Sequence, residues 1–194
     1  MRILSSLVAC AAVVVTAGLV VILGGLADVA ATSPHAPLTR WVLETAMENA
    51  VERRAAGLRP PGSLDSPERI RAGARAYDAM CVACHGAPGQ KPGILAEGLR
   101  PAPPPLAEEA HEWTAGELFW ITRHGVKMTG MPAFGPTHED AQLWEIVAFV
   151  RRLPQLGPAE YRALTRNEAE GSGAEGHDHR HDAASRAGPR DGRV

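Results

Sequence analysis

Residues 77–89 read YDAMCVACHGAPG and hold two of the chain's three cysteines. Cys81 and Cys84 are separated by two residues, and His85 directly follows the second cysteine. A redox dithiol, half of a zinc site and a haem attachment site all begin with the spacing C-x-x-C. The surrounding sequence therefore has to distinguish three kinds of chemistry.

Two of these three readings lack a required part. A thioredoxin-like dithiol needs a βαβ setting, but the flanks are a predicted helix at 67–80 and a segment rich in proline and glycine at 87–110. A structural zinc site needs four ligands, and residues 65–156 hold no second closely spaced Cys or His pair. Haem attachment lacks nothing, because two thiols form thioethers with one haem and the next imidazole reaches the iron. The motif predicts one covalent haem c, bound by Cys81 and Cys84, with His85 as an iron ligand.

The second axial ligand must come from elsewhere in the chain. Met131, in the loop TGMPAFG, offers a soft thioether donor, and Pro132 and the flanking glycines would hold its backbone close to the haem edge. The alternatives are Met128, His111, His124 and His138. His124 also has a structural explanation, since a positive imidazole at a helix C-terminus favours the helix dipole.

The pattern of caps and apolar positions predicts an all-α domain over residues 65–156. Helices are expected at 67–80, at 115–124 after a Thr114/Glu117 capping box, and at 138–154 after a cap at Thr137. No segment has the alternation of a strand. We expect the proline-rich stretch between the first two helices to be a fixed loop that wraps over the cofactor.

The chain begins with a segment that is apolar enough to enter a membrane. Residues 3–27 carry no charge, and a helix over them would be about 37 Å long, against about 30 Å for the hydrocarbon core. A retained anchor over residues 1–31 is favoured, with signal-peptidase cleavage at Val29-Ala30-Ala31 and lipidation of Cys10 as alternatives. Arg2 before the run and Asp28 after it place the N-terminus in the cytoplasm.

Two further segments complete the predicted organisation. Residues 32–64 hold one helix between proline-rich boundaries and are interpreted as a spacer. Residues 157–194 contain little that could be buried, so a disordered tail is predicted. Histidines alternate with charged residues in this tail and could bind a metal ion weakly, the alternative being a solvated tail without a specific role. They are His177, His179 and His181.

The order of these motifs resembles that of a known family. A helix with Gly73 and Tyr77, then CVACHG, a proline-rich loop, GMPAFG and a last helix LWEIVAFVRRLP resemble the small bacterial class I cytochromes c, particularly the cytochrome subunits of cbb3-type oxidases. The resemblance implies the class I cytochrome c fold, with Cys81 and Cys84 bound to haem and His85 and Met131 as iron ligands. It also implies that the helix with Gly73 and Tyr77 meets the last helix near Trp144 and Val147. Pro105 departs from the pattern, which has an acidic residue there.

These features together predict a function in electron transfer. With both axial positions filled by side chains the iron has no open site, so we expect an electron carrier without a small-molecule substrate and not an enzyme. A formal charge of −2 gives no indication of a nucleic-acid partner. The predicted location is a bacterial cytoplasmic membrane, single-pass, with the cytochrome domain in the periplasm among respiratory or dehydrogenase partners. The alternative is a haem-based enzyme or a gas or peroxide sensor with a displaceable sixth ligand.

Overall fold

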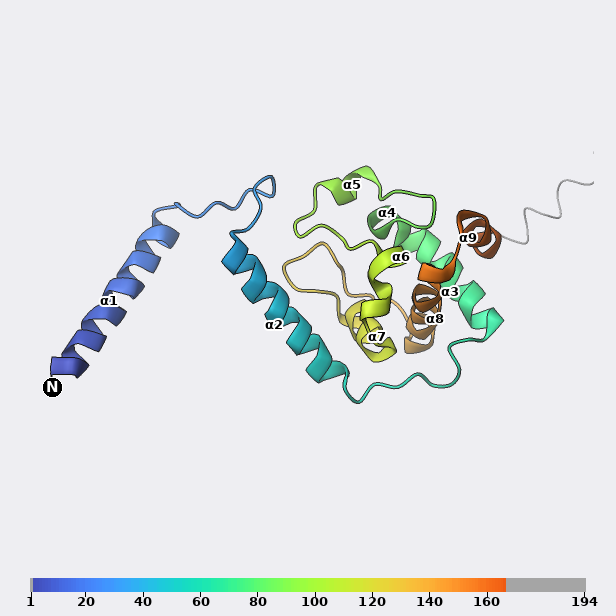
Figure 1. Cartoon of the computed structure of the whole chain (residues 1–194), viewed down its shortest axis with the longest axis horizontal. Helices are drawn as coiled ribbons and strands as arrows, with labels where there is room; N and C mark the ends of the chain where they lie inside the picture. Colours follow the sequence, from blue (N-terminus) through green and yellow to red (C-terminus); the bar gives the residue numbers. More distant parts are fainter. Residues whose placement is uncertain (1, 167–194) are drawn as a thin grey trace, which may run out of the picture.

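The computed structural model describes residues 2–166, and Figure 1 shows that helices account for all regular structure in this range. No strand occurs among these residues, which contain only an isolated bridge between Ala87 and Gln90. The prediction of an all-α fold is therefore confirmed. The α-helices are α1 (Arg2–Leu23), α2 (Pro37–Ala55), α3 (Pro67–Met80), α4 (Val82–His85), α5 (Ile94–Glu97), α6 (Leu106–Glu109), α7 (Ala115–His124), α8 (Asp140–Arg152) and α9 (Pro158–Thr165). Within residues 2–166 there are two 3₁₀ helices: η1 (Ala110–Glu112) lies between α6 and α7, and η2 (Leu153–Gln155) lies between α8 and α9.

The core is organised around the crossing of α3 and α8. A β-carbon added to Gly73 would lie 1.9 Å from the carbonyl oxygen of Glu145 and 3.0 Å from Phe149 Cβ, so only glycine allows this approach. Tyr77, one turn later, is fully buried with its ring 5.3 Å from that of Phe149. The two helices therefore cross as the resemblance implied, but the contacts at Gly73 and Tyr77 are made by Glu145 and Phe149, each one or two positions along α8 from the expected Trp144 and Val147.

α7 completes the core beside α8. Phe119 stacks on Trp144 with ring centroids 4.2 Å apart, and both are buried. The Thr114/Glu117 capping box is present at the start of α7, and the helix ends at His124 before Gly125, as predicted.

The last core helix begins later than the sequence suggested. α8 starts at Asp140 with Glu139 as its N-cap, so the prediction of a cap at Thr137 is wrong. The Thr137 hydroxyl instead donates to the carbonyl of Phe134 at 3.2 Å and lies 2.9 Å from His138 Nδ1. Thr137 and His138 thus belong to the turn before the helix.

α2, interpreted from sequence as a spacer, packs on the core with its second half. Val51 and Ala55 are buried, and a β-carbon on Gly116 of α7 would lie 3.1 Å from the carbonyl oxygen of Ala55. The segment 56–66 then leads to α3, and Leu64 within it is buried. The C-terminal half of α2 is therefore part of the compact body.

The prediction of a disordered tail from residue 157 is wrong for its first part, because α9 forms there. Tyr161 is 3% exposed, and its hydroxyl donates to a carboxylate oxygen of Asp78 on α3 at 2.6 Å. The helix has Pro158 at its first position and Glu160 bonded to the Gly157 amide at 2.7 Å. Tyr161 is a single buried aromatic residue in an otherwise polar segment, so the sequence shows no helical periodicity of apolar residues there. His177, His179 and His181 lie outside the described residues.

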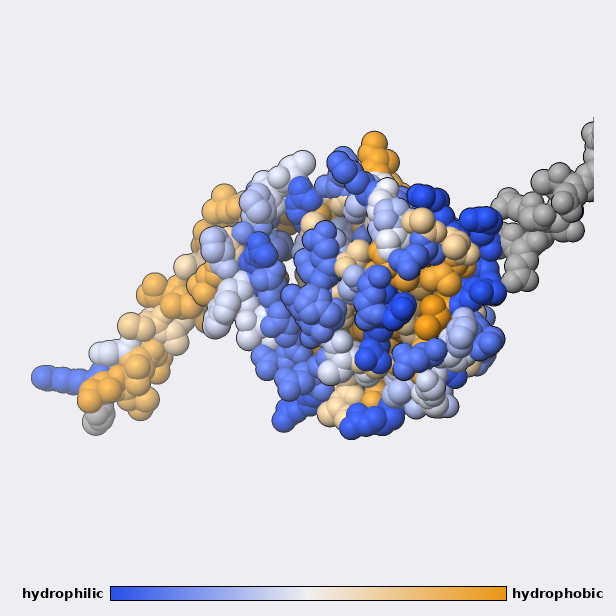
Figure 2. Space-filling view, turned by 45° about the vertical axis from the view of Figure 1, so that its right-hand side comes forward, coloured by the Kyte–Doolittle hydropathy of each residue, from blue (hydrophilic) through white to orange (hydrophobic). Residues whose placement is uncertain are grey.

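α1 makes no buried contact with the rest of the described chain, and all its residues are exposed. By length and composition it could cross a membrane. In Figure 2 it projects as a largely orange, hydrophobic rod beside a folded body whose surface is mostly blue.

Candidate functional site

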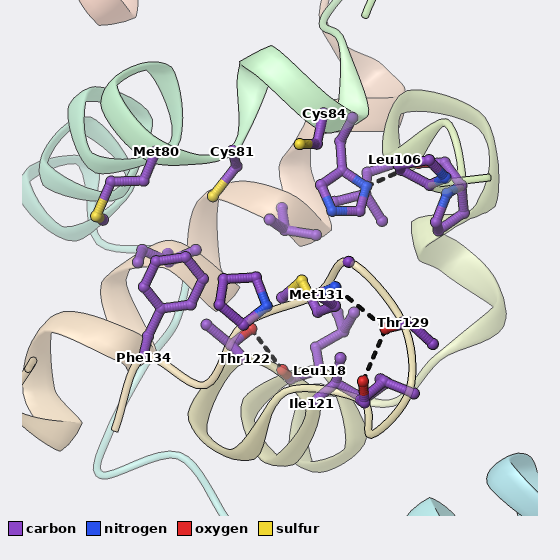
Figure 3. Close-up of a pocket in the computed structure, with 18 of the residues that line it drawn as sticks. Met80, Cys81, Cys84, Leu106, Leu118, Ile121, Thr122, Thr129, Met131 and Phe134 are labelled. Carbon is purple, nitrogen blue, oxygen red and sulfur yellow. Dashed lines mark hydrogen bonds between the residues drawn. The ribbon is translucent and has the colours of Figure 1, made fainter. Parts of the chain in front are cut away.

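The cysteine motif forms a tight turn at the end of α3. Cys81 ends α3, and its carbonyl accepts hydrogen bonds from the amides of Cys84 at 3.0 Å and His85 at 2.9 Å. The buried hydroxyl of Tyr77 donates to the carbonyl of Gly86 at 2.7 Å. The motif is therefore tied at its far end to the helix that precedes it, and both cysteine sulfurs project to one side of this turn, as Figure 3 shows.

His85 is held in one orientation by the proline-rich loop. Its Nδ1 lies 2.9 Å from the carbonyl oxygen of Pro104, which can only accept, so Nδ1 carries the proton. Burial lowers the pKa of His85, and the hydrogen bond to Pro104 opposes this effect. A neutral imidazole in this tautomer leaves Nε2 with a free lone pair, the form in which histidine binds a metal.

The two thiols differ in their surroundings. Cys81 is buried, and this burial, together with the nearby Cys84, raises the pKa of its thiol to about 12. Cys84 is half-buried. A thiol with so high a pKa is a poor nucleophile at neutral pH, which argues against a redox dithiol.

Met131 lies on a loop that is held by hydrogen bonds among Val126, Thr129 and Met131 itself. The amide of Met131 donates to the Thr129 hydroxyl at 3.1 Å, its carbonyl accepts from Val126 at 3.2 Å, and the Thr129 hydroxyl donates to the Val126 carbonyl at 2.8 Å. These bonds close a small loop that presents the Met131 side chain towards the cysteine turn (Figure 3). The short polar side chain of Thr129 therefore sets the direction of the methionine.

The other candidate axial ligands lie elsewhere. Met128 is 93% exposed with φ of 61°, and it does not line the cavity between the cysteines and Met131. His124 lies at the end of α7 with its ring 4.9 Å from that of Trp120, and His138 contacts Phe134. His111, on η1, does not line the cavity either.

A largely apolar cavity of about 220 Å³ separates the cysteine turn from the Met131 loop. Cys81, Cys84 and His85 line one side, and Met131 with Pro132 lines another. Among residues 2–166, no Asp, Glu, Lys or Arg side chain lines it. The remaining walls come from the proline-rich loop and the core helices, including Pro101, Pro103, Leu106, Trp113, Leu118, Ile121 and Val150.

A comparison with known protein families identifies the family to which this part of the chain is similar. Residues 68–150 match the family model described as cytochrome C oxidase, cbb3-type, subunit III. These residues form a c-type cytochrome domain. The cytochrome domain is akin to the cytochrome c subunits of cbb3 oxidases, its cofactor is a c-type haem, and its family carries out haem-based electron transfer. No curated protein matches the chain.

The residues of the cytochrome domain fit such a haem. An apolar cavity suits a flat hydrophobic macrocycle, and the two thiols at its border provide the thioether donors. His85, fixed through Nδ1, and Met131 are the ligand types that iron takes in c-type cytochromes.

Sequence reasoning missed one part of the cavity wall. Met47 of α2 lines the cavity, although it lies outside the matched residues 68–150. α2 has no clean apolar stripe, so its contact with the domain left no periodic signal. The carbonyl that accepts from His85 Nδ1 belongs to Pro104, and no spacing in the sequence distinguishes it from the neighbouring prolines. At Pro105, where the family pattern has an acidic residue, α6 starts without a side-chain cap.

Proposed function

We propose that this protein is a membrane-tethered monohaem c-type cytochrome that carries single electrons between respiratory or dehydrogenase partners on the periplasmic side. Cys81 and Cys84 would hold the haem through thioethers, and His85 and Met131 would ligate its iron. When bound, the haem supplies a one-electron ferric/ferrous couple. The observation that carries the proposal is the placement of His85 and Met131 around one cavity whose border holds both cysteines.

The chain's own residues make this site suited to electron transfer rather than to catalysis. The bond from His85 Nδ1 to Pro104 would keep the imidazole in one tautomer and orientation towards the iron. The apolar lining excludes water, and methionine with histidine ligation raises the reduction potential relative to two histidines. With His85 and Met131 both ligating the iron, no coordination position would remain for peroxide or a diatomic gas.

The membrane tether is α1. Its length and composition suit a single span, and Arg2 before it with Asp28 after it favours an N-terminus in the cytoplasm. The cytochrome domain would then lie in the periplasm, where thiols are available for haem attachment after export. Protease added outside spheroplasts tests this topology. We expect loss of the haem domain from the membrane, and protection of the domain would contradict it.

The ligand assignment is tested with the full chain purified in detergent. The wild-type ferrous protein is expected to be six-coordinate and to bind carbon monoxide poorly, whereas Met131→Ala should be five-coordinate and bind it readily. Met128→Ala is the matched control, because Met128 is 93% exposed, and it should behave as wild type. Cys81→Ser with Cys84→Ser should abolish covalent haem in the pyridine haemochrome assay.

Two results would overturn the proposal. A wild-type ferrous haem that is five-coordinate and binds carbon monoxide readily would favour the sensor or enzyme function. A Met128→Ala variant that loses six-coordination while Met131→Ala keeps it would reverse the ligand assignment.

A further inference from the structure

The first two turns of α2 carry apolar side chains that the folded body does not cover. Leu38, Trp41 and Val42 are 70%, 62% and 48% exposed. At about 100° per residue Leu38 and Val42 lie on the far side of the helix from Val51 and Ala55, which face α7 and are buried, whereas Trp41 lies about 40° from Ala55. Leu43, on another side of the same turns, is 52% exposed. Within residues 2–166 the folded body therefore leaves the first two turns of α2 open on more than one side, and we call the side that carries Leu38, Trp41 and Val42 its outer face.

The outer face changes character along the helix. Beyond Trp41 this face carries only polar or charged residues. Thr45 is half-buried, and the others, Glu48, Asn49 and Glu52, are exposed. The apolar part is thus confined to the end of α2 that follows α1 in the chain (Figure 1). A protein-binding helix would be expected to continue its apolar face over more turns.

The segment between α1 and α2 keeps this patch near the end of α1. Residues 24–36 could span at most about 45 Å if fully extended. They are not extended, because the amide of Leu26 donates to the Val21 carbonyl at 3.0 Å and that of Ser33 to the Ala30 carbonyl at 3.1 Å. A short tether raises the effective concentration of the patch at the surface that α1 enters.

The charge of this region suits a bilayer surface. Residues 29–43 contain no acidic side chain, and they include His35 and Arg40. Arg40 forms an exposed salt bridge with Glu44 at 2.8 Å, so the region carries no excess negative charge. Tryptophan is enriched where membrane meets water, so the exposed Trp41 suits this region.

We propose that Leu38, Trp41 and Val42 lie in the headgroup region of the bilayer, so that the first half of α2 is an interfacial helix. This rests on the proposed membrane tether and adds a second contact with the lipid. The second half of α2 packs on α7 through Val51 and Ala55, and Met47 lines the cavity proposed to hold the haem. One helix thereby joins the lipid surface to the cavity wall and sets the orientation of the haem domain relative to the membrane.

Photo-cross-linking in the full, haem-loaded chain tests the lipid contact. p-Benzoylphenylalanine is placed at position 15, 41 or 48, one at a time, in vesicles of phosphatidylcholine and phosphatidylglycerol. We expect lipid adducts at 15, within α1, and at 41, and a several-fold lower yield at 48, which lies two turns further along the same face. The reduced haem spectrum confirms that each variant is folded.

The cross-linking results distinguish failure of the interfacial-helix proposal from failure of the proposed α1 membrane anchor. An adduct at 15 without one at 41, or equal yields at 41 and 48, would overturn the interfacial helix and leave the tether intact. No adduct at 15 would overturn both. A cross-link from 41 to a second copy of the chain would replace lipid with a dimer contact and overturn the inference.

The orientation of the haem gives a second, independent test. Linear dichroism of the haem absorption in aligned bilayers should show a preferred orientation for the wild type. Replacement of Leu38, Trp41 and Val42 by serine should reduce the dichroism several-fold without releasing the protein from the membrane. The matched control is Ile94→Ser with Leu95→Ser, which removes exposed apolar side chains from α5 and should leave the dichroism unchanged. An unchanged signal in the α2 variant would overturn the inference.

Discussion

Gly125 lies directly against the peptide that joins Met131 to Pro132. A β-carbon at Gly125 would be 2.7 Å from the Met131 carbonyl oxygen and 2.8 Å from the Ala133 nitrogen, and its φ of 64° is in the left-handed region. The end of α7 thus supports the loop that carries the proposed methionine ligand. Both the backbone conformation and the close approach require glycine here.

Gly125→Ala should weaken the methionine ligation. The new methyl group must displace the Met131 loop, and the left-handed backbone adds strain, so we expect a loss of about 1–3 kcal/mol in stability. Loss of the red absorption band of the ferric methionine complex, at lower denaturant concentration than in wild type, would report it. Gly57→Ala is the control, since nothing lies within 4 Å of its added β-carbon. An unchanged band in Gly125→Ala would contradict the supporting role.

Gly73→Ala should separate α3 from α8. The added methyl group would lie 1.9 Å from the Glu145 carbonyl oxygen, which belongs to helix backbone and cannot rotate away. We expect a loss of about 3 kcal/mol or more in the free energy of unfolding, at the upper end for overpacking. Denaturant unfolding followed by far-UV circular dichroism measures it. A loss below about 1 kcal/mol would mean that the crossing adapts easily.

Tyr161→Phe should loosen α9 from α3. The variant keeps the buried ring but loses the bond from the phenol to Asp78 at 2.6 Å, so we expect a loss of about 1 kcal/mol, modest because Asp78 is exposed. A double-mutant cycle with Asp78→Ala isolates the pair. Additive effects of the two substitutions would show that the bond contributes nothing.

Alkaline pH should destabilise the protein through its two tyrosines. Burial raises the pKa of Tyr77, and burial together with Asp78 raises that of Tyr161, above the usual 10.0. The fold therefore favours neutral phenols, and this contribution is complete below pH 10 and decreases as pH rises beyond it. Unfolding free energies measured at increasing pH above 10 should decrease, less steeply in Tyr161→Phe. Equal slopes in the two proteins would refute the contribution of Tyr161.

Met47→Ser should lower the reduction potential of the haem. Met47 adds an apolar side chain to the cavity wall, and a hydroxyl with more water there favours the charged ferric state. We expect the reduction potential to fall by less than about 59 mV. For one electron, about 59 mV corresponds to a tenfold change in the equilibrium constant between the ferric and ferrous forms. Spectroelectrochemical titration measures it, with Met128→Ser as the exposed control. An unchanged potential in Met47→Ser would show that α2 does not affect the cofactor.

Local sequence was sufficient for several parts of this structure. The C-x-x-C-H spacing is a chemical pattern within one turn, so Cys81, Cys84 and His85 could be assigned a common role without a fold. The capping box at Thr114 and the long uncharged run of α1 are also encoded by neighbouring residues. The start of α8 was placed too early because Thr137 and Glu139 are both acceptable caps, and only the Thr137 bond to Phe134 excludes the first.

Other features depended on contacts between residues far apart in the chain. Sequence alone predicted the haem motif, the helices and a methionine loop, because each follows from spacing or caps within a few residues. The tertiary structure decided that Met131 rather than Met128 lines the cavity, that Pro104 accepts from His85, and that α2 and α9 pack on the body. A single buried side chain such as Tyr161 or Val51 gives no periodic pattern, so its partner can be identified only once the chain has folded and brought the two together.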